Sequence, residues 1–230
     1  MKILSIETSC EHASVALLID GEVVERTLEG HANHSERLLP TLRTLLADAG
    51  IALNALDAMA FGAGPGAFTG LRLACGVTQG LAMGADLGVA PVCSLAALAL
   101  QGTGESIYVL TDARMGEVYT AAYCLQDGYP LEIAPPACCP PDLLTLPPAG
   151  QWFAIGSALR TYEGRIPATV FDRLSGRNAD GVPRAGDVAR LAARMAGQGG
   201  LVPPEQAAPL YVRDKVALTT AERLARGGRA

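Results

Sequence analysis

The sequence predicts an α/β protein built from two similar lobes. An apolar strand, a second strand and an Asp-Gly turn occur near the N-terminus in "ILSIET…VALLIDG" and again in "IYVLTD…YTAAYCLQDG". Internal similarity of this kind is typical of duplicated architectures. Half of the 230 residues are apolar, so the chain can bury a sizeable core. We expect an N-terminal lobe over residues 1–103 and a C-terminal lobe over residues 104–230.

In the first lobe, the turn Asp20-Gly21 between two strand patterns indicates an antiparallel meander. Leucines on one face of residues 35–49 predict an amphipathic helix that ends at Gly50 and begins or bends near Pro40. The other elements expected in this lobe are strands over residues 2–7, 14–19, 22–27, 58–63 and 89–92, a helix over 71–83 and a short helix capped by Ser94.

The second lobe repeats the meander, with the turn Asp127-Gly128 after its second strand. From Pro135 onward the chain is rich in proline, which indicates a surface connection without regular structure. The other predicted elements are strands over residues 106–112, 118–125 and 152–155 and a helix over 187–195.

Charge and composition limit the classes of function. The formal net charge is −5, and the basic residues form no cluster, so any role on RNA would depend on a partner. The apolar runs are too short for a membrane span, and the six cysteines lack C-x-x-C spacing. We therefore expect a cytoplasmic protein.

The stretch "GAGPGAFTG" follows a strand and precedes a helix, which is a suitable context for an anion site. It lacks the lysine of a Walker loop, and the acid Asp86 stands before a strand, where a Rossmann acid should end one. Anion binding and a purely structural turn both remain open. The candidate anion or nucleotide contacts are Glu7, Thr8, Gly64, Gly66 and Thr69.

Glu7 and Asp112 lie at equivalent strand ends and are candidates for holding a metal–nucleotide, although closing a turn explains them more simply. His31 and His34 have the spacing of a shared metal site, but no third ligand is fixed nearby, so we interpret them as polar residues at a helix start. The sequence has no G-x-S-x-G serine elbow, and no Ser-His-Asp set can be argued from it, so neither motif supports a peptidase.

Three glycines, Gly76, Gly80 and Gly84, recur at every fourth position of the predicted helix over residues 71–83 and just beyond it. Each costs about 1 kcal/mol relative to alanine in a helix interior, so the stripe needs compensation. A smooth stripe allows close approach of another helix. That helix could belong to this chain or to another subunit.

Several segments resemble the TsaB family, also called YeaZ. They are "ILSIETS", "SVALLIDG", "HSERLLPTLRTLL", "GAGPGAFTGLRLACGVTQGLA", "GVAPVCSLAALA", "TDARMGEVYTAAY" and "PLYVRD", which span nearly the whole chain in the family's order. The resemblance implies a two-lobed actin-like fold, as in acetate kinase, sugar kinases and chaperone ATPases, with a ribonuclease-H-like core in each lobe. It also implies a role in forming threonylcarbamoyladenosine beside the anticodon of tRNA.

In this family the transferase TsaD does the chemistry, and the resemblance implies a non-catalytic partner for it, with no cofactor of its own. Ser94 and Leu98 stand where the metal-binding histidines of TsaD would stand, and they cannot replace imidazole ligands. The resemblance further implies a homodimer in isolation, contact with the ATPase TsaE and with tRNA only through the complex, and ATP with Mg²⁺ only at a shared interface.

The family pairs through the first two helices of the N-terminal lobe. Carried over to this chain, the expected partner interface consists of Leu38, Leu42, Leu45, Leu46, Leu73, Gly76, Val77, Gly80 and Gly84. The alternative is a nucleotide-dependent ATPase or phosphotransferase with its own site between the lobes, and a weaker alternative is a peptidase. The sequence leaves open whether the tail, residues 219–230, packs back on the first lobe.

Overall fold

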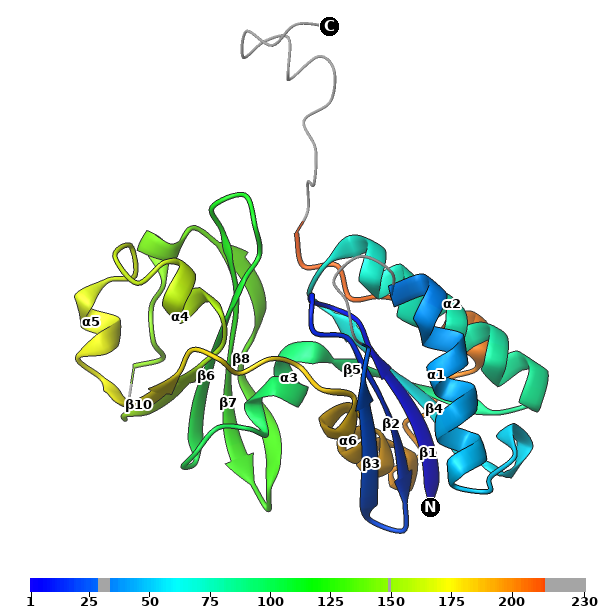
Figure 1. Ribbon diagram of the computed structural model, residues 1–230. Helices are drawn as coiled ribbons and strands as arrows, with labels where there is room; N and C mark the ends of the chain where they lie inside the picture. The colour runs from blue at the N-terminus through cyan, green and yellow to red at the C-terminus, as the bar shows by residue number, and fades with distance from the viewer. Residues whose placement is uncertain (29–33, 149, 214–230) are drawn as a thin grey trace, which may run out of the picture.

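The computed structural model describes residues 1–28, 34–148 and 150–213, which form two lobes side by side (Figure 1). Each lobe contains a mixed five-stranded sheet, with strand orders β3-β2-β1-β4-β5 and β8-β7-β6-β9-β10. Numbered from the first strand of each lobe, both orders read 3-2-1-4-5. The predicted duplication and the two-lobed actin-like fold are therefore confirmed.

The first sheet joins antiparallel and parallel pairs around its central strand. β1 pairs antiparallel with β2 and parallel with β4, and β4 pairs parallel with β5. The elements of this lobe are β1 (Lys2–Glu7), β2 (Ser14–Ile19), β3 (Glu22–Thr27), α1 (His34–Asp48), β4 (Ala58–Gly64), α2 (Phe68–Ala85), β5 (Gly88–Cys93) and α3 (Ser94–Ala99), with a 3₁₀ turn at Leu53–Ala55.

The second sheet has the same kinds of pairing around β6. Its elements are β6 (Ser106–Asp112), β7 (Val118–Gln126), β8 (Tyr129–Cys139), β9 (Trp152–Ile155), α4 (Ala158–Thr161), α5 (Ala168–Phe171) and β10 (Leu174–Asn178), with a 3₁₀ turn at Pro141–Leu143. After β10 the chain continues into α6 (Ala185–Gly197) and a 3₁₀ turn at Pro204–Gln206.

Both predicted Asp-Gly turns close a hairpin in the expected way. Asp20 and Gly21 have φ values of 49° and 96°, and Asp127 and Gly128 have 52° and 76°. Positive φ at both central residues is the requirement of a type I′ turn, which matches the twist of the flanking strands. The turn chemistry therefore fixes the pairing beside each turn, Ile19 with Glu22 and Gln126 with Tyr129.

Helices cover both faces of the first sheet (Figure 1). Leu4 and Ile6 of β1 point to the face covered by α1 and α2, whereas Ile3 belongs to the core beneath α6. In the second sheet, Tyr108 packs on the side of α4 and α5, and Ile107 packs toward α3, between the lobes. The alternation of side chains along each central strand thus divides the interior into four apolar clusters.

The course of the chain differs from the sequence-based expectations in three respects. The prediction of an irregular connection from Pro135 is wrong for residues 135–139, which belong to β8; an edge strand with register shifts accepts proline because it lacks a ladder partner on one side. α1 begins at His34 and continues through Pro40. Strand β10 and the short helices α4 and α5 were not predicted from the sequence.

α6 lies in the range predicted for the second lobe but packs against the first sheet, with Val188 and Ala192 in its core. The boundary at residues 103 and 104 itself stays a prediction. Residues 219–230, whose packing the sequence left open, lie outside the described residues.

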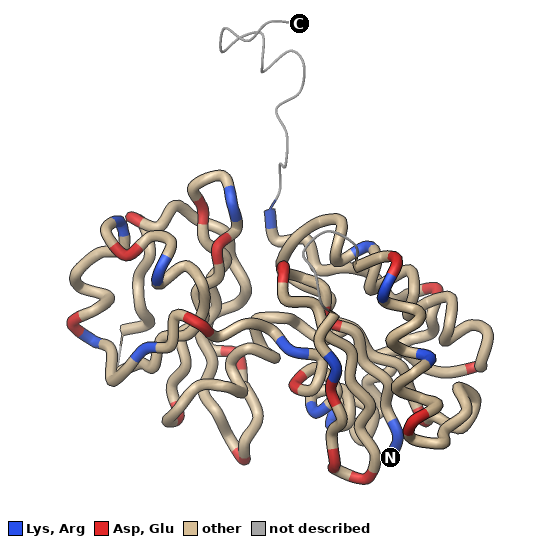
Figure 2. Tube along the Cα trace, in the orientation of Figure 1, with Lys and Arg blue, Asp and Glu red and all other residues tan. Residues whose placement is uncertain are grey.

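Acidic and basic positions are interspersed over both lobes (Figure 2). None of the helices within residues 1–28, 34–148 and 150–213 has the length and hydropathy needed to cross a membrane.

Candidate functional site

The glycine-rich loop after β4 packs tightly against the chain that leaves β1. The Ala67 N–H donates to the Ser9 carbonyl at 2.7 Å, and Thr8 Oγ1 donates to the Gly70 carbonyl at 2.7 Å. A Cβ added at Gly66 would overlap Ser9, and one at Gly70 would overlap the Thr8 carbonyl. These two glycines are therefore explained by close approach of two backbones.

The carboxyl group of Glu7 is sealed beneath the same loop. It accepts a hydrogen bond from the Ser9 N–H at 2.6 Å and one from Ser94 Oγ at 2.8 Å, and a Cβ at Gly62 would overlap it. Ser94 Oγ in turn accepts from the Gly64 N–H at 3.2 Å. Burial raises the pKa of Glu7, against the opposing effect of these hydrogen bonds.

The candidate anion contacts do not form one ligand site. The prediction is wrong for the side chains of Glu7 and Thr8, which are buried and already hydrogen-bonded within the protein. Gly64 is also buried, with a φ of +108°. Gly66 borders the pocket between the lobes, and Thr69 is exposed on α2.

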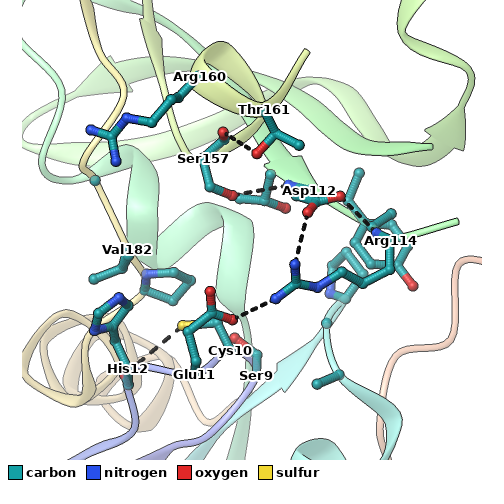
Figure 3. Close-up of a pocket in the computed structure, with 18 of the residues that line it drawn as sticks. Ser9, Cys10, Glu11, His12, Asp112, Arg114, Ser157, Arg160, Thr161 and Val182 are labelled. Carbon is teal, nitrogen blue, oxygen red and sulfur yellow. Dashed lines mark hydrogen bonds and ion pairs between the residues drawn. The ribbon is translucent and has the colours of Figure 1, made fainter. Parts of the chain in front are cut away.

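This pocket, of about 320 Å³, lies where the end of β1 faces the end of β6 (Figure 3). Glu11 and His12 face it from the first lobe, and Asp112, Arg114 and Arg160 face it from the second. Asp112 thus reaches the pocket, whereas Glu7, its equivalent in the first lobe, does not.

The charged groups of this pocket are already engaged with one another. Asp112 accepts hydrogen bonds from Tyr162 Oη and from the Arg114 N–H, each at 2.8 Å. The Arg114 guanidinium lies 3.2 Å from Asp112 Oδ2 and 3.0 Å from Glu11 Oε2, and so links the lobes. An anion entering the pocket would compete with two carboxylates for Arg114.

The cysteine of the pocket is a poor nucleophile. Burial, together with the charge of Glu7, raises the pKa of the Cys10 thiol to about 12. At neutral pH the thiol stays protonated, whereas the thiolate is the reactive form. Cys10 therefore does not support a cysteine-peptidase mechanism.

The glycine stripe of α2 is an open surface. Gly76, Gly80 and Gly84 are exposed, and a Cβ added at any of them would have nothing within 4 Å. No helix among the described residues occupies the stripe. Of the two interpretations left open by the sequence, internal packing is therefore wrong within the described chain.

The predicted leucine face of α1 needs a correction. Leu38, Leu42 and Leu45 are almost completely buried, because they form the core between α1, α2 and the first sheet. They cannot reach a partner, so the interface prediction is wrong for these three. Leu46, Leu73 and Val77 are half-buried at the margin of the same core. The exposed face of α1 carries Leu39 instead, which is 51% exposed.

α2 is poor in charge for an exposed helix. Its eighteen residues, FTGLRLACGVTQGLAMGA, include one charged side chain, Arg72. Met83 is 65% exposed and Phe68 44%. Charge depletion together with exposed Met and aromatic side chains is typical of the core of a protein interface.

Sequence reasoning missed the first turn of this surface. Phe68 and Arg72 extend the four-residue spacing of Gly76, Gly80 and Gly84 toward the N-terminus of α2. Tyr211 completes the group, with its ring centroid 5.6 Å from that of Phe68. The spacing was available in the sequence, but the distant Tyr211 carried no local signal.

The positions compared with metal-binding histidines have other roles. Ser94 Oγ donates to Glu7, and Leu98 is buried in the cluster between α3 and the second sheet. His34 begins α1, but His31 lies outside the described residues, so their predicted spacing is not tested.

Comparisons with known proteins cover both lobes. Residues 28–172 match the family model of TsaD, tRNA N6-adenosine threonylcarbamoyltransferase. The tRNA threonylcarbamoyladenosine biosynthesis protein TsaB of Escherichia coli (strain K12) is 34% identical over 94% of this chain and 96% of its own. The solved structure of YeaZ from Pseudomonas aeruginosa is 39% identical, with a TM-score of 0.84 over 91% of this chain and 99% of its own. Another solved structure from Pseudomonas aeruginosa, described as an uncharacterized protein similar to the peptidase YeaZ, is 40% identical, with a TM-score of 0.85 over 92% of this chain and 99% of its own.

Proposed function

The chain belongs to the TsaB (YeaZ) family, and we propose that it is a non-catalytic docking subunit of the complex that forms threonylcarbamoyladenosine in tRNA. In this role it binds the transferase TsaD and keeps that enzyme in its active arrangement. TsaD then modifies the adenosine beside the anticodon.

The open glycine stripe of α2 carries this proposal. Three exposed helical glycines, with nothing within 4 Å of an added Cβ among the described residues, cost up to about 1 kcal/mol each relative to alanine. A partner helix that packs closely onto them offsets this cost by dispersion contacts along the groove. The revised docking surface consists of Leu39, Leu46, Phe68, Arg72, Leu73, Gly76, Val77, Gly80, Met83 and Gly84.

The chemistry of the strand ends supports a non-catalytic role. Glu7 is enclosed by Ser9, Ser94 and the glycine loop, so it has no access to a ligand. Cys10 is held as a thiol, and Arg114 is engaged with two carboxylates. The substrates are then handled by the partner.

The remaining parts of the proposal concern the assembly. We place the protein in the cytoplasm, as a heterodimer with TsaD and as a homodimer through the same surface when TsaD is absent. TsaE and tRNA join through the complex, and ATP with Mg²⁺ binds only at a shared interface. The net charge of −5 supports contact with tRNA through partners rather than directly.

Replacing Gly80 with leucine tests the docking role. Gly80→Leu adds a side chain whose Cβ has nothing within 4 Å among the described residues, so we expect the monomer to keep its fold and docking to be lost. The readout is co-purification with TsaD from the same organism. Gly197→Leu is the control, because Gly197 is also exposed, helical and free of neighbours within 4 Å, but lies on α6. Binding of Gly80→Leu at wild-type stoichiometry would contradict the proposal.

A second candidate, a nucleotide-dependent enzyme, is favoured by the interlobe pocket of about 320 Å³ with Asp112, Arg114 and Arg160 on its wall. Calorimetry of the isolated chain with ATP and Mg²⁺, combined with a turnover assay, separates the two functions. Micromolar binding and turnover that disappear in Asp112→Asn would replace the docking role by an enzymatic one. Asp112 is the residue to change, since Glu7 does not reach the pocket.

A further inference from the structure

The first turn of α2 and the end of the described chain together hold one arginine in a fixed orientation. The Arg72 guanidinium carbon lies 3.9 Å from the centroid of the Phe68 ring, and Arg72 Nε donates to Tyr211 Oη at 3.1 Å. Tyr211 is itself fixed through its neighbour, because the Leu210 N–H donates to the Ala63 carbonyl at 2.7 Å. Segments far apart in the sequence therefore converge on Arg72.

This arrangement leaves one edge of the guanidinium unused. Phe68 covers a face of the planar group and Tyr211 takes the Nε–H, so the two terminal nitrogens remain at the surface. Within the described residues, no carboxylate forms an ion pair with Arg72. Other arginines do have carboxylate partners: Arg26, Arg114, Arg160, Arg165, Arg177, Arg190 and Arg213. The geometry of a guanidinium edge matches a carboxylate, which it can bind through two parallel hydrogen bonds.

Beside the stack lies a hollow of about 210 Å³ with mainly apolar walls, including Leu71, Met115 and Leu210. Phe68 and Tyr211 remain 44% and 50% exposed at its border. Aromatic residues and arginine are enriched among the residues that dominate binding energy, and pre-ordered side chains lose less entropy on binding. The site thus combines a cation with a space for an apolar side chain.

We propose that Arg72, held by Phe68 and Tyr211, is an anchor that receives a carboxylate of the docked transferase, whose neighbouring apolar side chain enters the hollow. The proposal rests on the docking function, and it follows from two observations. Arg72 is the one charge on α2 and has no acidic partner among the described residues, and it lies one helical turn before the glycine stripe.

The test compares two arginines that stack on aromatic rings. Arg72→Met keeps an apolar stem over Phe68 and removes the charge, whereas Arg194→Met does the same on α6, where Arg194 lies 4.2 Å from the Tyr129 ring. The dissociation constant with TsaD is measured by calorimetry at low and high salt. We expect Arg72→Met to weaken binding about 30-fold, the effect of removing a charged hot-spot residue from an interface. The salt dependence of binding should also fall, because the charge is lost. Arg194→Met should bind like the wild type.

Two further variants identify the chemistry. Tyr211→Phe removes the acceptor that orients Arg72 and should weaken binding roughly 2- to 10-fold. Replacing the exposed acids of TsaD one at a time by their amides should reveal one carboxylate whose loss has no further effect in the Arg72→Met background. If every such acid acts independently of Arg72, the carboxylate anchor is wrong.

The outcomes separate the anchor from the docking role. If Gly80→Leu blocks binding while Arg72→Met binds like the wild type, the anchor is overturned and docking stands. If neither variant alters binding, both are overturned. If Arg72→Met changes only self-association of the chain, measured by sedimentation, a second copy occupies the site and the proposal is wrong.

Discussion

The two lobes share one sheet topology and differ in what surrounds it. In the first lobe the sheet carries α1, of 15 residues, and α2, of 18; in the second, α4 and α5 have four residues each. The acid at the end of β1 is sealed by the glycine loop, whereas Asp112, at the end of β6, faces the interlobe pocket. The same sheet topology therefore supports different surfaces in the two lobes. The proposed docking surface lies on the long helices of the first lobe.

The largest effect is expected from the core that supports this helical surface. Leu38→Ala should lower the free energy of unfolding by about 3 kcal/mol, since Leu38 is fully buried and the lost methyl groups leave a cavity. Leu39→Ala, at the exposed neighbouring position, should change it by less than about 0.5 kcal/mol. Urea titrations measure both. Similar losses in the two variants would contradict the separation of α1 into a core face and an open face.

The sealed position of Glu7 at the end of β1 predicts a pH dependence. Because the pKa of Glu7 in the folded protein is raised above 4.5, the unfolded chain releases this proton first as the pH increases. The wild type should therefore lose stability relative to Glu7→Gln from about pH 4.5 upward, until the folded carboxyl also ionises. Thermal unfolding at a series of pH values measures the difference between the two proteins. A difference that stays constant with pH would mean that Glu7 is not sealed as described.

A third comparison concerns the glycine-to-alanine substitution on α2 and on α6. Gly80→Ala should raise the stability of the monomer by about 1 kcal/mol, since the new methyl group has no neighbour within 4 Å in the part of the chain that the structure describes and helix propensity improves. Gly186→Ala on α6 should gain less, because its Cβ would lie 3.1 Å from Val23 and 3.2 Å from Glu25. Unfolding is followed at concentrations where both proteins are monomeric. An equal gain in stability for Gly186→Ala would show that the surroundings of Gly186 are as open as those of Gly80.

The smallest effect concerns the ionic link between the lobes. Arg114→Gln removes the pairs with Glu11 and Asp112, but the Arg114 side chain is 70% exposed. Exposed ion pairs contribute little, so we expect a change in unfolding free energy of less than about 1 kcal/mol, and less still at high salt. A chemical denaturation curve at two salt concentrations checks this. A larger loss would mean that the pocket, rather than the cores, holds the lobes together.

Much of the fold could be predicted from local patterns. The Asp-Gly turns and the apolar strands around them determined both meanders, because type I′ geometry and alternation are local properties. β8 was missed because Pro135 and Pro136 favour irregular chain unless the strand lies at an edge, which depends on tertiary structure. The placement of α6 on the first sheet likewise depends on contacts distant in sequence.

The candidate site was predicted in part. The glycine spacing on α2 indicated a smooth stripe for another helix but not whether that helix belongs to this chain. The leucines of α1 were assigned to the wrong side, since an amphipathic pattern shows that a face is apolar and not what it packs against. The glycine loop illustrates the same limit. Gly66 and Gly70 serve the approach of Ser9 and Thr8, which no spacing within the loop reveals.

Hydrogen exchange on the chain with and without TsaD tests the docking surface most directly. We expect slower exchange in α1 and α2, with the strongest protection along α2 around the glycine stripe, and unchanged exchange in α6 on the opposite face of the same sheet. Protection confined to α6 or to the interlobe pocket, or none in α2, would contradict it.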